Sequence, residues 1–142
     1  VVQSMLAQVG IRVKILQLDS ASYYALRKDG KMQAYETYWS ADYNDPDNFI
    51  YTFFSEDNSA TRAFNYTNKK VFAKLEEARK MVDQNKRIKL YQELEKTIAQ
   101  DDAAWVPLFS TNQLFVVQPR VKHFRVSWNG WSDMSYNGIS VE

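Results

Sequence analysis

The first forty residues alternate between helix-like and strand-like hydrophobic patterns, and this rhythm restricts the fold more than any other feature of the sequence. Apolar residues recur at helical spacing over 1–9 and 20–29, and a glycine follows each segment. Ser20 is predicted to be the N-cap of the second helix. Residues 11–16 and 32–39 instead have the pattern of strands. A helix–strand–helix–strand order predicts an α/β fold.

The middle of the chain has the pattern of an amphipathic helix pair over 68–82 and 84–98, with Asp83 as the predicted N-cap of the second helix. The expected apolar faces are Val71, Phe72, Leu75, Ala78 and Val82, and then Ile88, Tyr91, Leu94 or Glu95, and Ile98. The mixed charges of the pair favour a solvated outer face over a nucleic-acid surface. Strand-like apolar runs follow at 104–110, 114–117 and 124–128.

Composition excludes several classes of function. The absence of cysteine removes disulfides, thiolate metal sites and cysteine nucleophiles, and the single histidine, His123, cannot form a two-histidine metal site. Four scattered glycines form no phosphate-binding loop, and a net charge of +1 gives no general attraction for nucleic acid. A calcium loop is disfavoured because Pro46 stands where a ligand belongs. We therefore predict no catalytic residue, metal or cofactor, and no nucleic-acid partner.

Residues 32–61 form an acidic, aromatic zone that contains no lysine or arginine. Its six carboxylates are Glu36, Asp42, Asp45, Asp47, Glu56 and Asp57. Its centre, DYNDPDN, is predicted to be a loop, followed by a short helix or irregular apolar plug over 49–54. Carboxylates beside aromatic rings suit an ammonium-bearing ligand, because no basic side chain nearby in the sequence competes for them. The alternative, which composition leaves open, is that the rings are core and the aspartates cap turns.

The segment YWSADYNDPDNF, residues 38–49, resembles the pattern GW-x-ADY-x-(D/E)P-x-x-F of the family 5 solute-binding proteins, the oligopeptide- and dipeptide-binding receptors of bacterial ABC importers. Three further blocks, residues 3–39, 65–109 and 121–142, resemble segments of that family in the same order. The resemblance therefore extends over essentially the whole chain.

The resemblance implies an α/β fold in which a mixed sheet with flanking helices forms the C-terminal lobe of a two-lobed, type II periplasmic-binding-protein-like fold. Residues 1–118 would form the ligand-binding lobe, and residues 119–142 would return to the first lobe. Because the family's members are much longer, the chain is expected to be a C-terminal piece of a receptor. The aromatic side chains of its tail, Phe124, Trp128, Trp131 and Tyr136, would then be exposed or buried by self-association.

The resemblance also implies a set of ligand-binding residues. Asp42 matches the family's aspartate that pairs with the α-ammonium group of a peptide, and Trp39 matches the tryptophan that lines a side-chain pocket. Tyr38 replaces the glycine that is usual before this tryptophan. Tyr43 and Asn44 are included as neighbours.

The function implied is that of a non-enzymatic, substrate-binding component of an ABC transporter. Its two lobes would close around a peptide outside the cytoplasm, in the periplasm or lipid-anchored at the cell surface, and the closed form would dock on the importer's membrane subunits. Three alternatives stay open at this point. They are another solute such as a nickel chelate or an oligosaccharide, a carboxylate-dependent hydrolase, and a plain interaction domain. Burial of Asp42 with bonds only to backbone would favour the last.

Overall fold

The computed structural model describes residues 1–128 and 136–142, and the chain divides into two compact units, residues 1–35 and 36–142. Trp131, one of the predicted tail aromatics, lies outside the described residues. Among the described residues, no helix is both long enough and apolar enough to cross a membrane.

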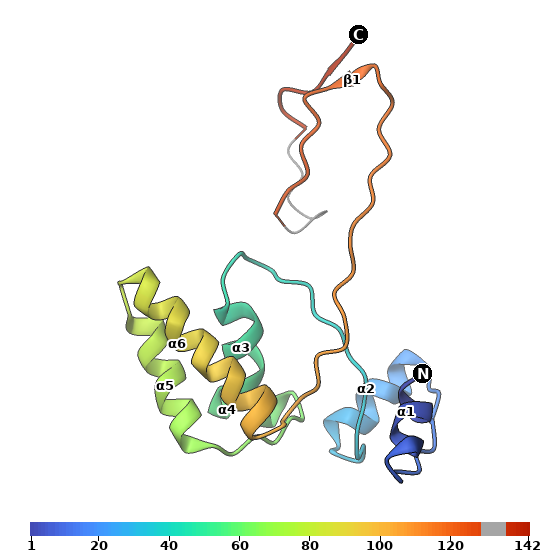
Figure 1. Cartoon of the computed structure of the whole chain (residues 1–142), viewed down its shortest axis with the longest axis vertical. Helices are drawn as coiled ribbons and strands as arrows, with labels where there is room; N and C mark the ends of the chain where they lie inside the picture. The colour runs from blue at the N-terminus through green and yellow to red at the C-terminus, as the bar shows by residue number, and fades with distance from the viewer. Residues whose placement is uncertain (129–135) are drawn as a thin grey trace. The chain divides into compact units, whose positions relative to one another are not determined.

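The first unit contains two short helices, α1 (Val2–Gln8) and α2 (Ser20–Lys28), drawn in blue in Figure 1. Both confirm the helices predicted from hydrophobic spacing. The N-cap of α2 is Asp19 rather than the predicted Ser20, because the Asp19 carboxylate accepts hydrogen bonds from the Ser22 amide at 3.0 Å and the Ser22 hydroxyl at 2.6 Å. Ser20 is therefore the first residue of the helix.

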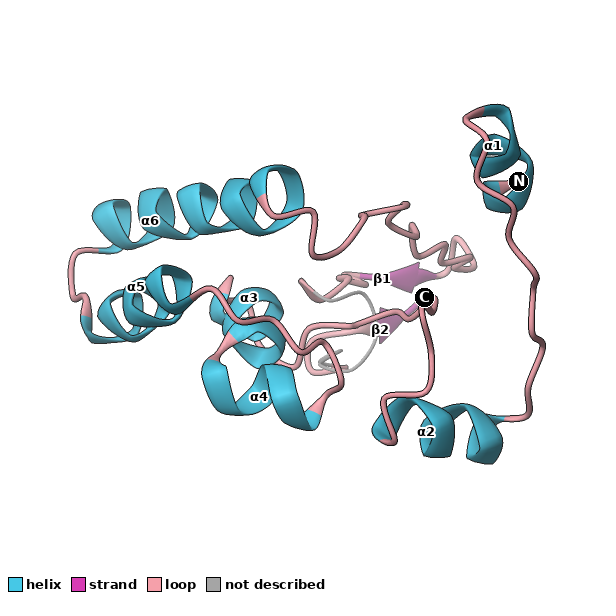
Figure 2. Cartoon of the chain, turned by 90° about the horizontal axis from the view of Figure 1, so that it is seen from below, coloured by secondary structure: helices cyan, strands magenta, loops and turns pink. Residues whose placement is uncertain are grey.

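The second unit is built on a group of packed helices. These are α3 (Asp47–Phe54), α4 (Glu56–Thr61), α5 (Lys69–Lys80) and α6 (Gln84–Lys96), which continues into a π-helical turn, η1 (Thr97–Asp101). α5 and α6 form the predicted amphipathic pair, and α3 packs against both (Figures 1 and 2). Asp83 caps α6 as predicted, accepting a hydrogen bond from the Lys86 amide at 3.1 Å.

The core of this unit lies where α3, α5 and α6 meet. Its buried apolar residues are Ile50, Phe53, Phe54, Val71, Leu75, Ala78, Tyr91, Leu94 and Ile98. The structure selects Leu94 over Glu95 for the α6 face, because Leu94 is buried and Glu95 is exposed. Val82 and Ile88 were predicted to lie on the apolar faces and do not, since their exposed fractions are 91% and 45%.

The predicted mixed sheet is not found among the described residues. Their only sheet is an antiparallel pair, β1 (Val121–Lys122) and β2 (Ser140–Val141), in which Val121 pairs with Val141 (Figure 2). The segments predicted as strands, 11–16, 32–39, 104–110, 114–117 and 124–128, have no regular strand. A helix satisfies its hydrogen bonds within one segment, whereas a strand needs a neighbouring segment for its ladder, and these segments have none here.

Candidate functional site

The acidic loop takes its shape from the start of α3. Pro46 stands at the N-cap position and offers no capping side chain, but Asp45 Oδ1 accepts a hydrogen bond from the Asp47 amide at 2.8 Å. Asp47 lies in the first turn of α3, where a negative charge interacts favourably with the helix dipole. The loop predicted from DYNDPDN therefore leads directly into α3, and the hydrogen bond at the start of this helix holds the end of the loop in place.

Asn48, in the first turn of α3, joins the two residues that the sequence placed at the centre of the binding site. Its Oδ1 accepts hydrogen bonds from Trp39 Nε1 at 2.8 Å and from the Asp42 amide at 2.9 Å. Its Nδ2 donates to Asp42 Oδ2 at 3.2 Å. Asn48 is only 3% exposed, so this link between Trp39 and Asp42 is shielded from water.

Asp42 itself is exposed. One carboxylate oxygen receives the Asn48 hydrogen bond, and the other, Oδ1, accepts no hydrogen bond from any described residue. The condition that would have favoured a plain interaction domain, burial of Asp42 with bonds only to backbone, is therefore not met. The carboxylate is held from one side and open on the other.

Trp39 is half-buried at the edge of the core. Its ring meets Phe53 edge to face, with centroids 5.1 Å apart and an interplanar angle of 89°. The guanidinium carbon of Arg62 lies 5.1 Å from the centroids of both rings. Trp39 therefore has a satisfied ring N–H and a cation–π neighbour, and it is fixed in orientation by three separate contacts.

Asp45 has a structural partner far along the chain. Arg87 Nη1 and Nη2 donate to its two carboxylate oxygens at 2.7 and 2.8 Å, and Arg87 Nε donates to the Ala78 carbonyl at 3.1 Å. The hydrogen bonds from Arg87 hold the pKa of the Asp45 carboxyl below its usual range. Arg87 is 8% exposed, so this bidentate pair ties the loop to the interior face of α6.

Asp47 is buried and accepts hydrogen bonds from two phenols. Tyr91 donates to its Oδ1 at 2.7 Å and Tyr43 donates to its Oδ2 at 3.0 Å, while Arg79 Nε lies 3.4 Å from Oδ1. Asp45 and Asp47 are therefore structural residues, and of the loop's three aspartates Asp42 is the one presented to solvent. The interpretation in which the aspartates are structural therefore applies to Asp45 and Asp47.

From the sequence, no basic side chain was expected to compete for the carboxylates of residues 32–61. The structure shows that this expectation is wrong. The zone contains no lysine or arginine in sequence. In the structure, however, Arg62, which directly follows α4, and Arg79 and Arg87, on α5 and α6, fold onto it. Two of them neutralise Asp45 and Asp47. Among the three aspartates of the loop, Asp42 is consequently the one without an arginine partner among the described residues.

The remaining predicted site residues are less constrained. Tyr43 is 47% exposed, and burial, with the nearby Asp47 carboxylate acting in the same direction, raises the pKa of its phenol. Tyr38 is 91% exposed, and Asn44 is exposed as well. The structure thus brings together Trp39, Asp42 and Tyr43 through α3, and it places Tyr38 and Asn44 outside this network.

Sequence reasoning missed Asn48, Arg62, Arg87 and Tyr91 as parts of this site. Asn48 carried a local signal, since it is an amide within an acidic loop directly after a helix start. Arg87 carried none, because its partner Asp45 lies 42 residues away. Only folding of α6 against α3 brings these two together.

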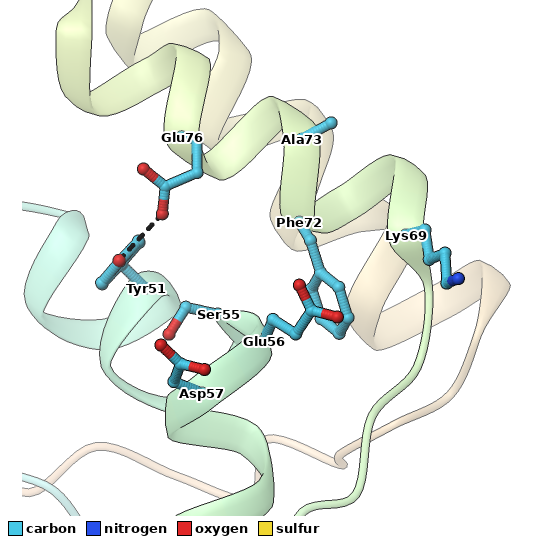
Figure 3. Close-up of a pocket in the computed structure, with 8 residues that line it drawn as sticks. All are labelled: Tyr51, Ser55, Glu56, Asp57, Lys69, Phe72, Ala73 and Glu76. Atoms are coloured by element: carbon cyan, nitrogen blue, oxygen red, sulfur yellow. Dashed lines mark hydrogen bonds between the residues drawn. The ribbon is translucent and has the colours of Figure 1, made fainter.

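A concavity lies between α4 and α5, away from these residues, and has a volume of about 470 Å³ (Figure 3). Glu56 and Asp57 line it from α4, and Phe72 and Glu76 line it from α5. Tyr51 closes one end by donating a hydrogen bond to Glu76 Oε1 at 2.8 Å. None of the residues predicted to bind a ligand lines this groove.

Comparison with known proteins gives a family match and several relatives. Residues 1–61 match the family described as bacterial extracellular solute-binding proteins, family 5 Middle. The chain is 34% identical over 125 residues to the probable D,D-dipeptide-binding periplasmic protein of Escherichia coli (strain K12), covering 86% of this chain and 24% of that protein. It is 32% identical over 133 residues to the dipeptide-binding protein of the same strain, covering 86% and 25%.

A relative of another named specificity is also similar. The chain is 28% identical over 137 residues to heme-binding protein A of Haemophilus influenzae, covering 96% of this chain and 24% of that protein. The chain thus spans about a quarter of the length of these relatives. The similarity extends well beyond the acidic loop, as the four resembling blocks indicated.

Proposed function

Because this chain is a relative of the family 5 bacterial extracellular solute-binding proteins, we propose that it belongs to the substrate-binding component of an ABC importer and captures peptides. One observation carries the proposal for this chain. An exposed carboxylate, Asp42, is fixed beside a half-buried aromatic ring, Trp39, by the buried amide of Asn48. This arrangement suits the α-ammonium group of a peptide.

The chemistry of ammonium recognition explains why these groups suit the task. An ammonium group that leaves water needs a carboxylate partner, because an unpaired desolvated charge is strongly disfavoured. Asp42 Oδ1 is open to such a partner, while its Oδ2 is held by Asn48. Trp39 has its ring N–H satisfied by Asn48 and packs against Phe53 and Arg62, so only the exposed part of its ring can contact an apolar part of the ligand. Tyr43 borders the same site, with Tyr38 and Asn44 as outer neighbours.

We place these residues in a larger architecture. The family relationship implies a two-lobed, type II periplasmic-binding-protein-like fold. Residues 1–118 would form its C-terminal lobe, and residues 119–142 would return to the first lobe. In that setting the extended segments 11–16 and 32–39 would find partners and become strands of a mixed sheet. The ligand would lie between the lobes and be enclosed by their closure.

The proposed partners follow from the same role. The closed, peptide-loaded form would dock on the importer's membrane subunits, outside the cytoplasm. The name of one relative includes the word periplasmic, which supports an extracytoplasmic location for this chain. Residues 119–142 would associate with a second copy if the first lobe is absent.

A carboxylate-dependent hydrolase is less well supported. Such an enzyme needs a carboxylic acid whose pKa is raised so that it stays protonated at neutral pH. Among the described residues, hydrogen bonds lower the pKa of Asp19, Asp29, Asp45 and Asp102, which is the opposite direction. Relatives whose names include peptide binding likewise support a binding protein over an enzyme.

Native mass spectrometry of the whole protein, purified without added ligand, tests the proposed specificity. We expect the mass of a bound peptide that is released on denaturation. Recovery of heme, a metal chelate or an oligosaccharide in its place would contradict the peptide assignment and leave the family relationship intact.

A further inference from the structure

Most of the hydrogen-bonding capacity of the Asn48 side chain is taken up by Trp39 and Asp42, two residues of the proposed peptide site. An asparagine amide offers two acceptor lone pairs and two N–H donors. Both lone pairs of Oδ1 are occupied, one by Trp39 Nε1–H and one by the Asp42 amide, and Nδ2 donates to Asp42 Oδ2. All three hydrogen bonds go to Trp39 or Asp42.

The pattern of donors and acceptors fixes which way this amide points. The indole and backbone N–H groups that face Oδ1 can only donate, and the carboxylate that faces Nδ2 can only accept. A flipped amide would put an NH₂ group against two donors and an oxygen against a carboxylate. The asparagine therefore has one orientation, and neither an aspartate nor a leucine at position 48 would reproduce it.

The start of α3, which carries Asn48, is itself held in place by hydrogen bonds of the neighbouring aspartates. Asn48 follows Asp47, whose carboxylate accepts hydrogen bonds from Tyr43 and Tyr91. Asp45 is held by the bidentate pair with Arg87 on α6. Through Asp45 and Asp47, the start of α3 is thus connected to Arg87 and Tyr91 on α6. Asn48 cannot move without breaking buried hydrogen bonds.

We propose that Asn48 is the positioning residue of the peptide site, because it holds the carboxylate of Asp42 and the ring of Trp39 in one geometry through a single buried amide. Asn48 does not contact the ligand. It holds Oδ2 of the exposed Asp42 carboxylate and so leaves Oδ1 available for the ligand's ammonium group. This inference rests on the proposed peptide-binding function and adds to it the residue that preorganises the site.

If Asn48 orients Asp42, the contribution of Asp42 to peptide affinity should depend on Asn48. If Asn48 only stabilised the fold, the two contributions would be independent. With Asn48 present, the carboxylate is already oriented, and its full attraction for an ammonium group is realised. Without Asn48, Asp42 is an exposed, freely rotating side chain, and exposed ion pairs contribute little. The effect of removing the Asp42 charge should therefore shrink when Asn48 is absent.

A double-mutant cycle on peptide affinity measures this dependence. The variants are Asp42→Asn, Asn48→Ala and the double variant in the whole receptor, titrated with trialanine by calorimetry. In the unaltered background we expect Asp42→Asn to weaken binding by at least about thirtyfold, and in the Asn48→Ala background by less than about threefold. Asn85→Ala, an exposed asparagine on α6, is the matched control and should leave the full thirtyfold effect.

The contrary outcomes are distinct from one another. An equal effect of Asp42→Asn in both backgrounds would overturn the positioning role while leaving peptide binding and Asp42 in place. A protein that binds neither trialanine nor any co-purified peptide would remove the proposed function, and this inference with it.

A measurement on the unaltered protein tests the same proposal if the Asn48→Ala variant does not fold. Nuclear magnetic resonance follows the Asn48 side-chain amide and the Trp39 indole N–H during titration with trialanine. We expect both resonances to shift together at saturation, and neither to shift with N-acetyl-trialanine at the same concentration. An Asn48 amide that stays unchanged while trialanine saturates the protein would contradict the proposal.

Discussion

Each aspartate of the loop before α3 has its own environment, and these environments give the three residues separate roles. Asp45 is paired with a guanidinium and Asp47 with two phenols, whereas Asp42 is exposed and held by an amide. The same change, from aspartate to asparagine, should therefore affect ligand binding at Asp42 and stability at Asp45 and Asp47.

The first prediction concerns Asp42→Asn. Truncating one member of a desolvated charge pair costs about 2 to 5 kcal/mol, which corresponds to at least about thirtyfold in affinity. We expect this loss of peptide affinity in the whole receptor by calorimetry, with an unchanged unfolding midpoint. Asp57→Asn, the same change at an exposed position on α4, should leave affinity unchanged. Equal affinity of the Asp42→Asn and unaltered proteins would remove Asp42 from the site.

The second prediction concerns the pair of Arg87 and Asp45. Removing one partner of a largely buried, bidentate pair leaves the other unpaired, and we expect Arg87→Met to lower the free energy of unfolding by about 2 kcal/mol at pH 7. Lys86→Met is the control. Its side chain is 76% exposed and lies 3.7 Å from Asp83, so its loss should change stability by less than about 0.5 kcal/mol.

The pH dependence of this effect has a definite sign. Because Arg87 depresses the pKa of Asp45 in the folded protein, the pair's contribution is present above the unfolded carboxyl's pKa of about 4. That contribution is lost as the pH falls through the lower, folded value. Urea unfolding should therefore show a gap between the unaltered and Arg87→Met proteins that is wide at pH 7 and narrower near pH 2.5. A gap that widens in acid would contradict the assignment.

At the scale of elements, α5 and α6 were predictable because their signals are local. Apolar spacing of three and four residues identifies both helices, Asp83 marks the start of α6, and Gly10 and Gly30 follow α1 and α2 with positive φ angles of 82° and 65°. Strand prediction failed because alternation shows only that a segment is extended. Whether it becomes a strand depends on a partner elsewhere.

The same distinction applies to the site. Trp39 and Asp42 were predicted from a contiguous segment, whereas Arg62 comes from the end of α4 and Arg87 from α6. Their contribution depends on how α3, α4 and α6 pack, and no spacing within the loop encodes that. The claim of an uncontested acidic zone failed for this reason.

The third prediction tests the helix pair itself. Leu75 on α5 is fully buried in the core, so Leu75→Ala should lower the free energy of unfolding by about 2 to 5 kcal/mol through lost burial and the cavity left behind. Ile88→Ala on α6 removes similar apolar volume from a side chain that is 45% exposed, and it should cost less than about 1 kcal/mol. Similar losses for the two variants in urea titrations would contradict the packing described.

At the scale of the whole molecule, several large apolar side chains outside the helical core are exposed to solvent. Leu114 and Val116 are 88% and 92% exposed, and Trp128 and Tyr136 are 46% and 67% exposed. The chain spans about a quarter of the length of its relatives. In the proposed receptor, residues 119–142 would be covered by the first lobe.

The fourth prediction concerns the 142-residue chain on its own. We expect it either to bind an apolar dye or to form a dimer through residues 119–142, because its apolar side chains lack the proposed lobe. Light scattering and dye fluorescence measure these two outcomes. A monomer that binds no dye would count against the return of this segment to another lobe.

The central claim, that Asp42 and Trp39 form a site for a peptide's α-ammonium group, is tested most directly by blocking that group on the ligand. Calorimetry of the whole receptor with trialanine and with N-acetyl-trialanine compares two ligands that differ at the amino terminus. We predict that acetylation weakens binding by at least about thirtyfold, and that Asp42→Asn abolishes most of this difference. Equal affinity for the two peptides in the unaltered receptor would contradict the account.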